Sequence, residues 1–525
     1  MAYSSEEIVE PFWAEFSTAA KGRDPLAIQN SSVVIYSKMV VGITNVTTRI
    51  RYNGFFCWIF DTILQNIDKK NSLQEQIRYS RRAELLLAFV MTKHFNAELG
   101  VGGSLYANKN LKSNIDLSEG ADWEFKEKGK NNLYWNNHGG IFGQVYAAVM
   151  RQLGLINYPN QQSNLKIFTL TEKGNELAKV FKQHILEEEI KLFWQAVSSG
   201  SIKEEELIKL KSFALNIILD SEREFYNKML LSADNKGPYL THHRSETIKL
   251  LLVHLSKHNK GVEKLVSSFL CANYFFHQNK SYLKKDTATA WYLFELNELI
   301  HLAYEHFHSC FLYFIKTYPT LLDYNIDELV KEAKLAFDQN DALKEVKTIE
   351  QLAHWISIYE EDIYVVCDKM EQSFSAREFG KCLMYAVKLL FYVQVNSSKH
   401  FDQLEEFAAT PENNFNRFGY AVDLIHELVI TQRELSIHDY MKSIIIKAIN
   451  YHNFSSYRKT RIGQSLVHNY MIEDHLVWRL RKTSPNRTNP RLQNLIQYMI
   501  DIGWVKREGK VASISATGKS IFEDI

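Results

Sequence analysis

Two stretches of this 525-residue chain end in the same way. The first runs Leu153-Gly154-Leu155-Ile156, a polar linker, and then Ile167-Phe168-Thr169-Leu170-Thr171-Glu172-Lys173-Gly174. The second runs Ile502-Gly503-Trp504-Val505, a shorter linker, and then Val511-Ala512-Ser513-Ile514-Ser515-Ala516-Thr517-Gly518. In each, a glycine ends a helix, apolar residues begin a strand, a turn follows, and a second strand leads into Ser/Thr-x-x-Gly at the start of another helix. The pattern predicts a helix, a β-hairpin and a helix at both places.

Both endings resemble the close of a winged-helix domain, in which the hairpin is the wing. The resemblance implies two modules that dock on nucleic acid or protein. We place the first at residues 81–180, with a long insertion over 100–140, and the second at residues 451–525. An N-terminal helical segment, which contains an aromatic and arginine-rich helix, occupies residues 1–80.

Residues 181–450 form the body between the modules. Apolar residues recur there at i, i+3 and i+4, and the whole chain has only eight prolines, so the segment is predicted to be helical. No repeat of fixed length is found, which argues against a solenoid. The predicted fold is therefore mainly α: an irregular helical bundle flanked by two winged-helix (α+β) modules.

Composition narrows the class of protein. The chain is 46% hydrophobic and 23% charged, as globular proteins are, and its five cysteines include no C-x-x-C pair that would indicate a zinc or disulfide framework. The first residues lack the basic and apolar regions of a signal peptide, and no apolar run reaches the roughly 18 residues that span a bilayer. We expect a cytoplasmic protein with no membrane contact and no cofactor.

Charge is distributed unevenly along the chain. Residues 451–525 contain twelve lysines and arginines but six acids, a net charge of +6, whereas the whole chain is +1. A basic helix and wing favour nucleic acid as a partner, with duplex DNA preferred, because the first turn of a recognition helix reaches bases and phosphates. The predicted contacts are Arg481, Lys482, Arg487, Arg491, Gln493, Asn494, Gln497, Lys506 and Arg507. The alternative is a module that docks on protein.

Arg49 and Arg51 begin an apolar, aromatic helix, where the helix dipole disfavours cations. We expect either a structural pair, compensated by carboxylates from the body beyond residue 180, or an anion site. The spacing Thr-x-Arg-x-Arg-Tyr-x-x-Phe-x-x-Trp over residues 47–58 resembles uncharacterised bacterial helical proteins encoded beside phage-defence genes. That resemblance implies an antiviral context.

Two further patterns could carry chemistry. Arg433 and His438 match the Arg-x(4–6)-His spacing of HEPN-type ribonucleases, which implies acid–base cleavage of RNA in a dimer cleft. Glu298, His301, Glu305 and His308 lie at spacings of three or four, as carboxylate–histidine metal ligands do in helical bundles; the alternative is a solvated helix face.

The favoured function is a non-enzymatic nucleic-acid-binding or adaptor component of a bacterial complex, with further protein partners. The alternatives are a HEPN-like ribonuclease and, because a winged helix near each end of a helical middle is similar to kleisins, a subunit that docks on an ATPase.

Overall fold

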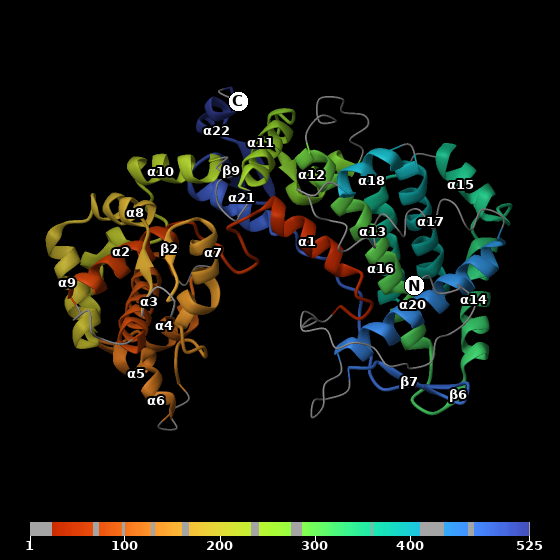
Figure 1. Cartoon of the computed structure of the whole chain (residues 1–525), viewed down its shortest axis with the longest axis horizontal. Coiled ribbons are helices and arrows are strands. Elements are labelled where there is room, and N and C mark those ends of the chain that lie inside the picture. The colour runs from red at the N-terminus through yellow and green to blue at the C-terminus, as the bar shows by residue number, and fades with distance from the viewer. Residues whose placement is uncertain are drawn as a thin grey trace. The chain divides into compact units, whose positions relative to one another are not determined.

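The computed structural model describes residues 24–66, 73–96, 100–127, 132–159, 167–232, 241–274, 286–358, 361–398, 400–409, 435–459 and 467–523. The chain divides into two compact units (Figure 1). Unit 1 consists of Met1–Ser37 and Leu270–Pro490, and unit 2 consists of Lys38–Phe269 and Arg491–Ile525. Residues 451–490 therefore belong to unit 1, whereas residues 491–525 belong to unit 2.

Unit 2 is built from helices and short strands. Its elements in chain order are α2 (Arg51–Asn66), α3 (Leu73–Phe95), α4 (Ser104–Asn110), β1 (Asn114–Asp116), α5 (Leu117–Ala121), α6 (Trp123–Glu127), the π-helix η1 (Phe142–Tyr146), α7 (Ala147–Gln152), β2 (Ile156–Asn157), β3 (Thr169–Leu170), α8 (Glu172–Lys182), α9 (Glu187–Ser199), β4 (Ser201–Lys203), the 3₁₀ helix η2 (Glu204–Phe213), α10 (Asp220–Leu231), α11 (His242–Ser256), β5 (Val262–Glu263), α12 (Leu265–Tyr274, which starts here), α21 (Leu492–Asp501), β9 (Val505–Glu508), β10 (Val511–Ile514) and α22 (Ala516–Glu523). Strands β1 and β4 pair antiparallel.

Helix α2 is the centre of the unit 2 core. Its aromatic residues are buried on every side, and α3 and α8 pack against it. The Trp58 ring lies 4.9 Å from that of Phe213 and 5.2 Å from that of Phe193. Close-packed aromatic rings bury large apolar areas, which makes them a dominant source of stability.

The two similar endings make equivalent hydrogen bonds. Helix α7 leads to the antiparallel pair β2–β3 and then α8, and α21 leads to β9–β10 and then α22. Thr171 Oγ1 donates to Gly154 O and accepts from Gly174 N, and Ser515 Oγ bonds Gly503 O and Gly518 N in the same way. The repeated sequence thus encodes one repeated turn and cap, as its spacing predicts.

A third strand extends the C-terminal hairpin. β5 pairs antiparallel with β10, so the sheet order is β5–β10–β9, and α11 packs against β10 and α22. The partner strand lies about 250 residues earlier in the chain, so the sequence pattern of the C-terminal segment alone does not reveal it.

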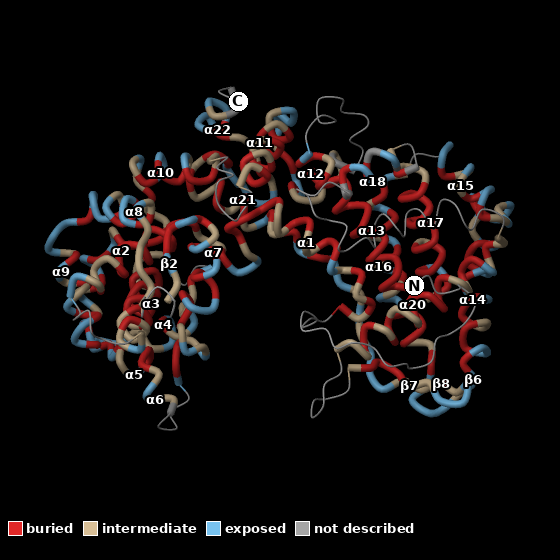
Figure 2. Tube along the Cα trace, in the orientation of Figure 1, coloured by how far each residue is buried: buried red, intermediate tan, exposed pale blue. Residues whose placement is uncertain are grey.

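Unit 1 contains most of α1 (Gln29–Met39), followed by α13 (Asp286–Phe314), β6 (Thr320–Leu321), α14 (Leu322–Asp338), α15 (Ile349–Ile358), α16 (Ile363–Ser375), α17 (Phe379–Ser398), α18 (Phe401–Ala409), α20 (Ile437–Lys459), β7 (Tyr470–Glu473) and β8 (Leu476–Arg479). Buried residues run along α13 and α17 (Figure 2). Helix α13 packs against α14, α17 and α20, and the strands form a sheet in the order β6–β8–β7.

The prediction of a mainly helical protein is confirmed: in the residues that the structure describes, helices predominate and the short strands form small antiparallel sheets. Within the described part of the chain, no helix combines the length and apolar character that crossing a membrane requires.

Candidate functional site

Exposed cations surround the C-terminal hairpin of unit 2. β9 carries Lys506 and Arg507, and Lys510 follows at the turn. Because β5 pairs with β10, with Glu263 opposite Val511, the lysines that flank β5 lie at the same sheet. We call the following exposed residues the hairpin patch: Lys257, Lys260, Lys264, Lys506, Arg507 and Lys510. Glu263 and Glu508 are the exposed acids on the same strands.

The polar face of α21 is turned towards the chain itself. Arg491 Nη1 donates to Ile43 O at 3.0 Å, and Asn494 Nδ2 donates to Thr44 O at 2.6 Å. Gln497 donates to Asp501 at 2.9 Å, which leaves Gln493 as the exposed member of the predicted set on this helix. The helix starts at Leu492, and Arg491 directly before it has a φ of 62°.

The segment before α2 is held by α7 and α21, the helices that precede the two hairpins of unit 2. Gly42 N donates to Gln152 Oε1 of α7 at 3.0 Å, and Ile50 N donates to Asp501 Oδ2 of α21 at 3.1 Å. Both helices thus use polar side chains to satisfy the irregular backbone of residues 42–50, which would otherwise be buried with unpaired groups.

The remaining predicted nucleic-acid contacts belong to unit 1. Arg481 Nε donates to Asn469 Oδ1 at 2.8 Å, Lys482 lies over the Tyr313 ring at 4.4 Å, and Arg487 pairs with Glu371 at 2.6 Å and with Asp368 at 3.5 Å. The set that looks continuous in the sequence is therefore divided between the two units.

Arg51 and Arg49 each meet a carboxylate. Arg51 is buried and donates to both oxygens of Glu222, with Nη2 2.7 Å from Oε1. Arg49 Nε lies 3.2 Å from Asp501 Oδ2, and its Nη2 lies 2.5 Å from Asn216 Oδ1. The predicted compensation by a carboxylate of the body is confirmed for Arg51. For Arg49, the carboxylate comes instead from the C-terminal segment.

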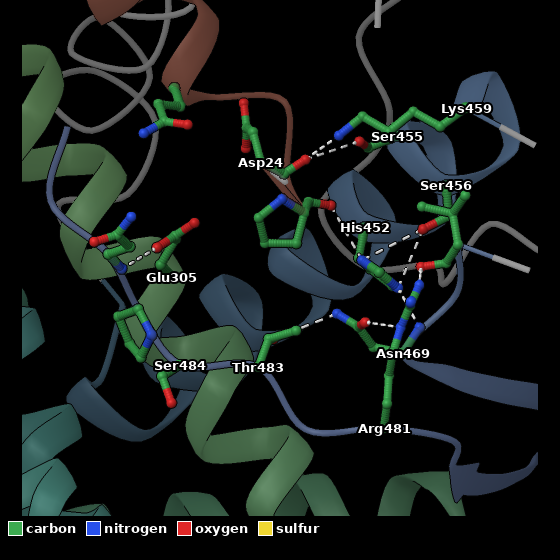
Figure 3. Close-up of a pocket in the computed structure, with 15 residues that line it drawn as sticks. Asp24, Glu305, His452, Ser455, Ser456, Lys459, Asn469, Arg481, Thr483 and Ser484 are labelled. Carbon is green, nitrogen blue, oxygen red and sulfur yellow. Dashed lines mark hydrogen bonds between the residues drawn. The ribbon is translucent and has the colours of Figure 1, made fainter. Parts of the chain in front are cut away.

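Unit 1 contains a polar cavity of about 640 Å³ (Figure 3). The cations Lys459 and Arg481, the carboxylates Asp24 and Glu305, and the imidazole of His452 line it together with serine, threonine and asparagine side chains. Lys459 Nζ donates to the backbone oxygen of Asp24, and burial lowers the pKa of this lysine. A wall that mixes charges of both signs suits a polar ligand better than an apolar one.

His452 is held as a neutral imidazole. Nδ1 donates to Pro25 O at 3.1 Å, and Nε2 accepts from Asn469 N at 3.0 Å, two contacts that together require the neutral form. Burial, and then the neighbouring His308, hold the pKa of His452 well below its usual value. Ser456 Oγ is 3.2 Å from Nε2, but Asn469 already occupies that nitrogen, so the pair does not form an activated nucleophile.

The predicted metal ligands on α13 separate into two groups. His301 lies between Glu298, 3.4 Å from Nδ1, and Glu305, 3.2 Å from Nε2. Burial opposes the charged imidazolium, but the two carboxylates outweigh it and raise the pKa of His301 well above its usual value. His308 instead contacts Asn469 at 3.1 Å and stacks near His452, so it does not join His301. The alternative of a solvated helix face is wrong, because all four side chains are buried.

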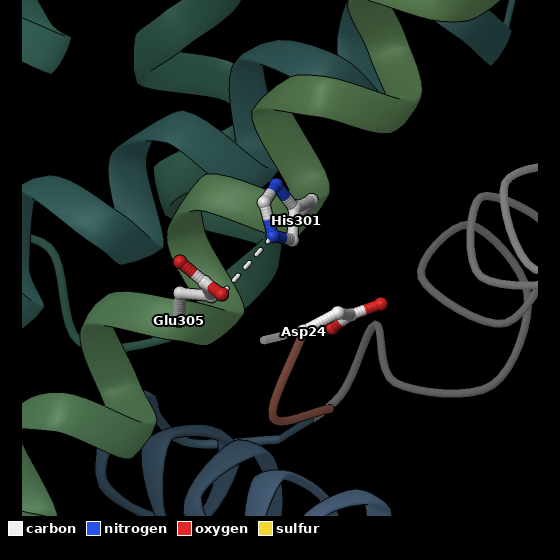
Figure 4. Close-up of side chains that lie close together, drawn as sticks. All are labelled: Asp24, His301 and Glu305. Carbon is white, nitrogen blue, oxygen red and sulfur yellow. Dashed lines mark ion pairs between the residues drawn. The ribbon is translucent and has the colours of Figure 1, made fainter. Parts of the chain in front are cut away.

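Asp24 is a neighbour of His301 and Glu305 that sequence spacing could not reveal. Metal ions are bound by histidine, cysteine, aspartate and glutamate side chains. Among the described residues, Asp24, His301 and Glu305 are the one group of three such side chains whose possible ligand atoms all lie within 4.8 Å of one another (Figure 4). Asp24 is about 270 residues from the helix, and its own neighbours in the sequence carry no metal-binding pattern.

The ribonuclease pair cannot be assembled from the described residues. Arg433 lies outside them. His438 lies in the first turn of α20, with its side chain 37% exposed and Nδ1 3.3 Å from Asp439 Oδ1.

Comparison with known proteins adds no relative. No protein-family model, no curated protein and no solved structure matches this chain.

Proposed function

We propose that this chain is a non-enzymatic nucleic-acid-binding component of a bacterial complex, and that it contacts duplex DNA through the hairpin patch. The supporting observation is the pairing of β5 with β10, which gathers six exposed cations from residues 257–264 and 506–510 around one small sheet. Clustered lysines and arginines attract the phosphate backbone and release its counterions.

We infer that the sheet belongs to a winged-helix module assembled from two segments. The order α11, β5, α12, α21, β9, β10, with the sheet arranged β5–β10–β9, is the order that a winged helix has. In this reading β9–β10 is the wing, and residues 275–490 are an insertion in the chain between the second and third helices. The first ending, α7–β2–β3–α8, is the related module proposed for residues 81–180.

The wing, rather than the third helix, is the contact we propose. Arg491, directly before α21, donates to Ile43 O, and Asn494 of α21 donates to Thr44 O. Binding DNA with these donor groups would first require breaking those bonds. Lys506, Arg507 and Lys510 are exposed.

The full-length chain should bind a duplex of about 20 base pairs with strong salt dependence, measured by fluorescence anisotropy. With one phosphate contact each from Lys506, Arg507 and Lys510, we expect the affinity for DNA to fall about 40-fold between roughly 50 and 200 mM salt. The triple variant K506E/R507E/K510E should lose most of this affinity and most of the salt slope. K260E/K264E should also weaken binding, because β5 brings those lysines to the same sheet.

The matched control is K191E/K209E/K211E, which changes the charge of unit 2 equally at exposed lysines away from this sheet. It should bind as the wild type does. Equal losses in both triple variants would mean that net charge alone drives binding. No binding by the wild type at the lowest salt would contradict the proposal.

An adaptor role is the second proposal, and the docking of α7 and α21 on residues 42–50 favours it. These helices already recognise an irregular peptide segment through side-chain amides and carboxylates, which is the chemistry of protein docking. The antiviral context proposed from residues 47–58 would be tested by deleting the gene from its native host. Phage plating that does not change would argue against that context.

A further inference from the structure

We propose that Asp24, His301 and Glu305 bind a divalent transition-metal ion at the wall of the unit 1 cavity. The proposal is independent of the hairpin patch. Its starting point is the donor set: one imidazole nitrogen and two carboxylates whose ligand atoms lie within 4.8 Å of one another. An ion with bonds of about 2.1 Å holds its donors roughly 3 to 4 Å apart, so small side-chain rotations close the site.

The buried polar atoms point to a missing partner. Asp24 is 7% exposed; its Oδ1 accepts from Leu26 N at 3.2 Å, but its Oδ2 is buried without a hydrogen-bond partner. His301 is fully buried. The carboxylates of Glu298 and Glu305 lie at ion-pair distance from its ring nitrogens, but neither nitrogen makes a hydrogen bond. Buried charged groups are normally paired or bound to metal, because losing water is costly.

The surroundings orient the proposed ligands. Glu305 Oε2 accepts from Asn486 N at 2.8 Å, which leaves Oε1 on the side of His301 Nε2. On the other side of the ring, Glu298 lies 3.4 Å from Nδ1 and is itself held by Ser32 Oγ and Thr488 N. A carboxylate behind a histidine is the usual support for a metal-bound imidazole, since it fixes the ring and raises its basicity.

The donor types limit the choice of ion. Imidazole favours zinc, iron, nickel and copper, whereas carboxylates favour manganese, magnesium and calcium. One nitrogen with two carboxylates therefore fits Mn²⁺, Fe²⁺ or Zn²⁺ better than Mg²⁺ or Ca²⁺. Three protein ligands leave coordination positions free, and because Asp24 and Glu305 line the cavity, a polar molecule there would have access to the ion.

The test uses the full-length chain, stripped with a chelator and titrated with MnCl₂ under electron paramagnetic resonance, which reports free Mn²⁺ directly. One saturable site per chain is expected, and ZnCl₂ should compete for it. Bound Mn²⁺ should also raise the melting temperature, because a ligand that binds only the folded state stabilises it.

Variants identify the ligands. D24N/E305Q keeps the side-chain shapes and should abolish the site, and H301Q should do the same. E298Q removes only the support behind the ring and should weaken Mn²⁺ binding about 10- to 100-fold. H308Q is the matched control, because His308 is buried on the same helix but contacts Asn469 instead; it should bind Mn²⁺ as the wild type does.

Circular dichroism and melting curves must show that each variant is folded. Should D24N/E305Q fail to fold, the single variant D24N replaces it, since it keeps Glu305 on α13 unchanged and preserves the shape of the Asp24 side chain. Mn²⁺ binding that survives loss of the two carboxylates would overturn the assignment. So would a wild-type chain that binds neither Mn²⁺ nor Zn²⁺, in which case the cluster is an ion pair between a protonated His301 and its glutamates.

Discussion

Arg51 and Glu222 form an ion pair that is closed to solvent. The two side chains are 1% and 0% exposed, and Arg51 Nη2 lies 2.7 Å from Glu222 Oε1. Arg51 Nη1 also donates to Ser212 O at 2.9 Å, so the guanidinium ties the first turn of α2 to two later segments of unit 2. The pair thus allows a cation to begin an aromatic helix.

Removing one partner of this pair should cost more than removing both. Glu222→Gln leaves a buried guanidinium without a counter-charge and should lower the free energy of unfolding by about 3 to 5 kcal/mol, whereas Arg51→Met with Glu222→Leu should cost clearly less. Urea unfolding of the single and double variants measures this. Stable variants that lose nucleic-acid binding would show that the arginine is an anion site instead.

The side chain of Asn494 should contribute to folding rather than to DNA binding. Asn494→Ala removes the bond to Thr44 O, and we expect a loss of about 1 kcal/mol in stability with unchanged DNA affinity. Asp501→Asn should cost more, because it leaves Arg49 without its carboxylate. Melting curves and anisotropy titrations on the same samples separate the two effects. A large loss of affinity in a fully stable Asn494 variant would restore α21 as the contact.

Gly518 should tolerate no side chain. A β-carbon there would lie 2.2 Å from Trp504 O, a backbone atom that cannot move aside without disturbing β9. Gly518→Ala should therefore destabilise the hairpin by more than about 2 kcal/mol and weaken DNA binding with it. Gly509→Ala is the control: its φ of 59° strains alanine by about 1 kcal/mol, but nothing lies within 4 Å of its β-carbon. Hydrogen exchange of the β9–β10 amides would show the difference, and equal protection in both variants would contradict this account.

Because of His452, the free energy of unfolding should decrease as pH falls below about 6.5. In the folded protein the pKa of His452 is well below the usual 6.5. As pH falls below 6.5, the imidazole therefore becomes protonated in the unfolded chain but stays neutral in the folded one. This contribution is complete well above pH 6.5. It is lost as pH falls, with a slope that approaches about 1.4 kcal/mol per pH unit once the unfolded histidine is mostly protonated. His301 has the opposite shift, so the stability it contributes is present below pH 6.5 and is lost as pH rises above that value.

The variant His452→Asn isolates this effect, because asparagine can still donate to Pro25 O but does not titrate. Other groups titrate equally in both proteins and cancel in the difference. Denaturant unfolding at pH 6.5 and 5.5 should show the wild type losing about 1 kcal/mol more than the variant, because half of the unfolded chains are already protonated at pH 6.5. Parallel curves would mean that folding does not lower the pKa of His452.

Local patterns were readable from the sequence because their causes are local. The helical class follows from apolar spacing, and both hairpin endings follow from Gly, then apolar residues, then Ser/Thr-x-x-Gly, in which Thr171 and Ser515 cap the next helix. The need to compensate Arg51 was also predictable, because the cost of a buried charge does not depend on which residue neutralises it.

Tertiary structure alone decided which residues meet. Lys264 joins Lys510 because β5 pairs with β10, and Asp24 joins His301 because the start of α1 packs near α13. It also turned Asn494 inward, although its helix position looked like a nucleic-acid contact. Spacing along one helix or strand fixes which side chains share a face, but the partner of that face is chosen by packing between segments hundreds of residues apart, and one sequence carries no local signal for that choice.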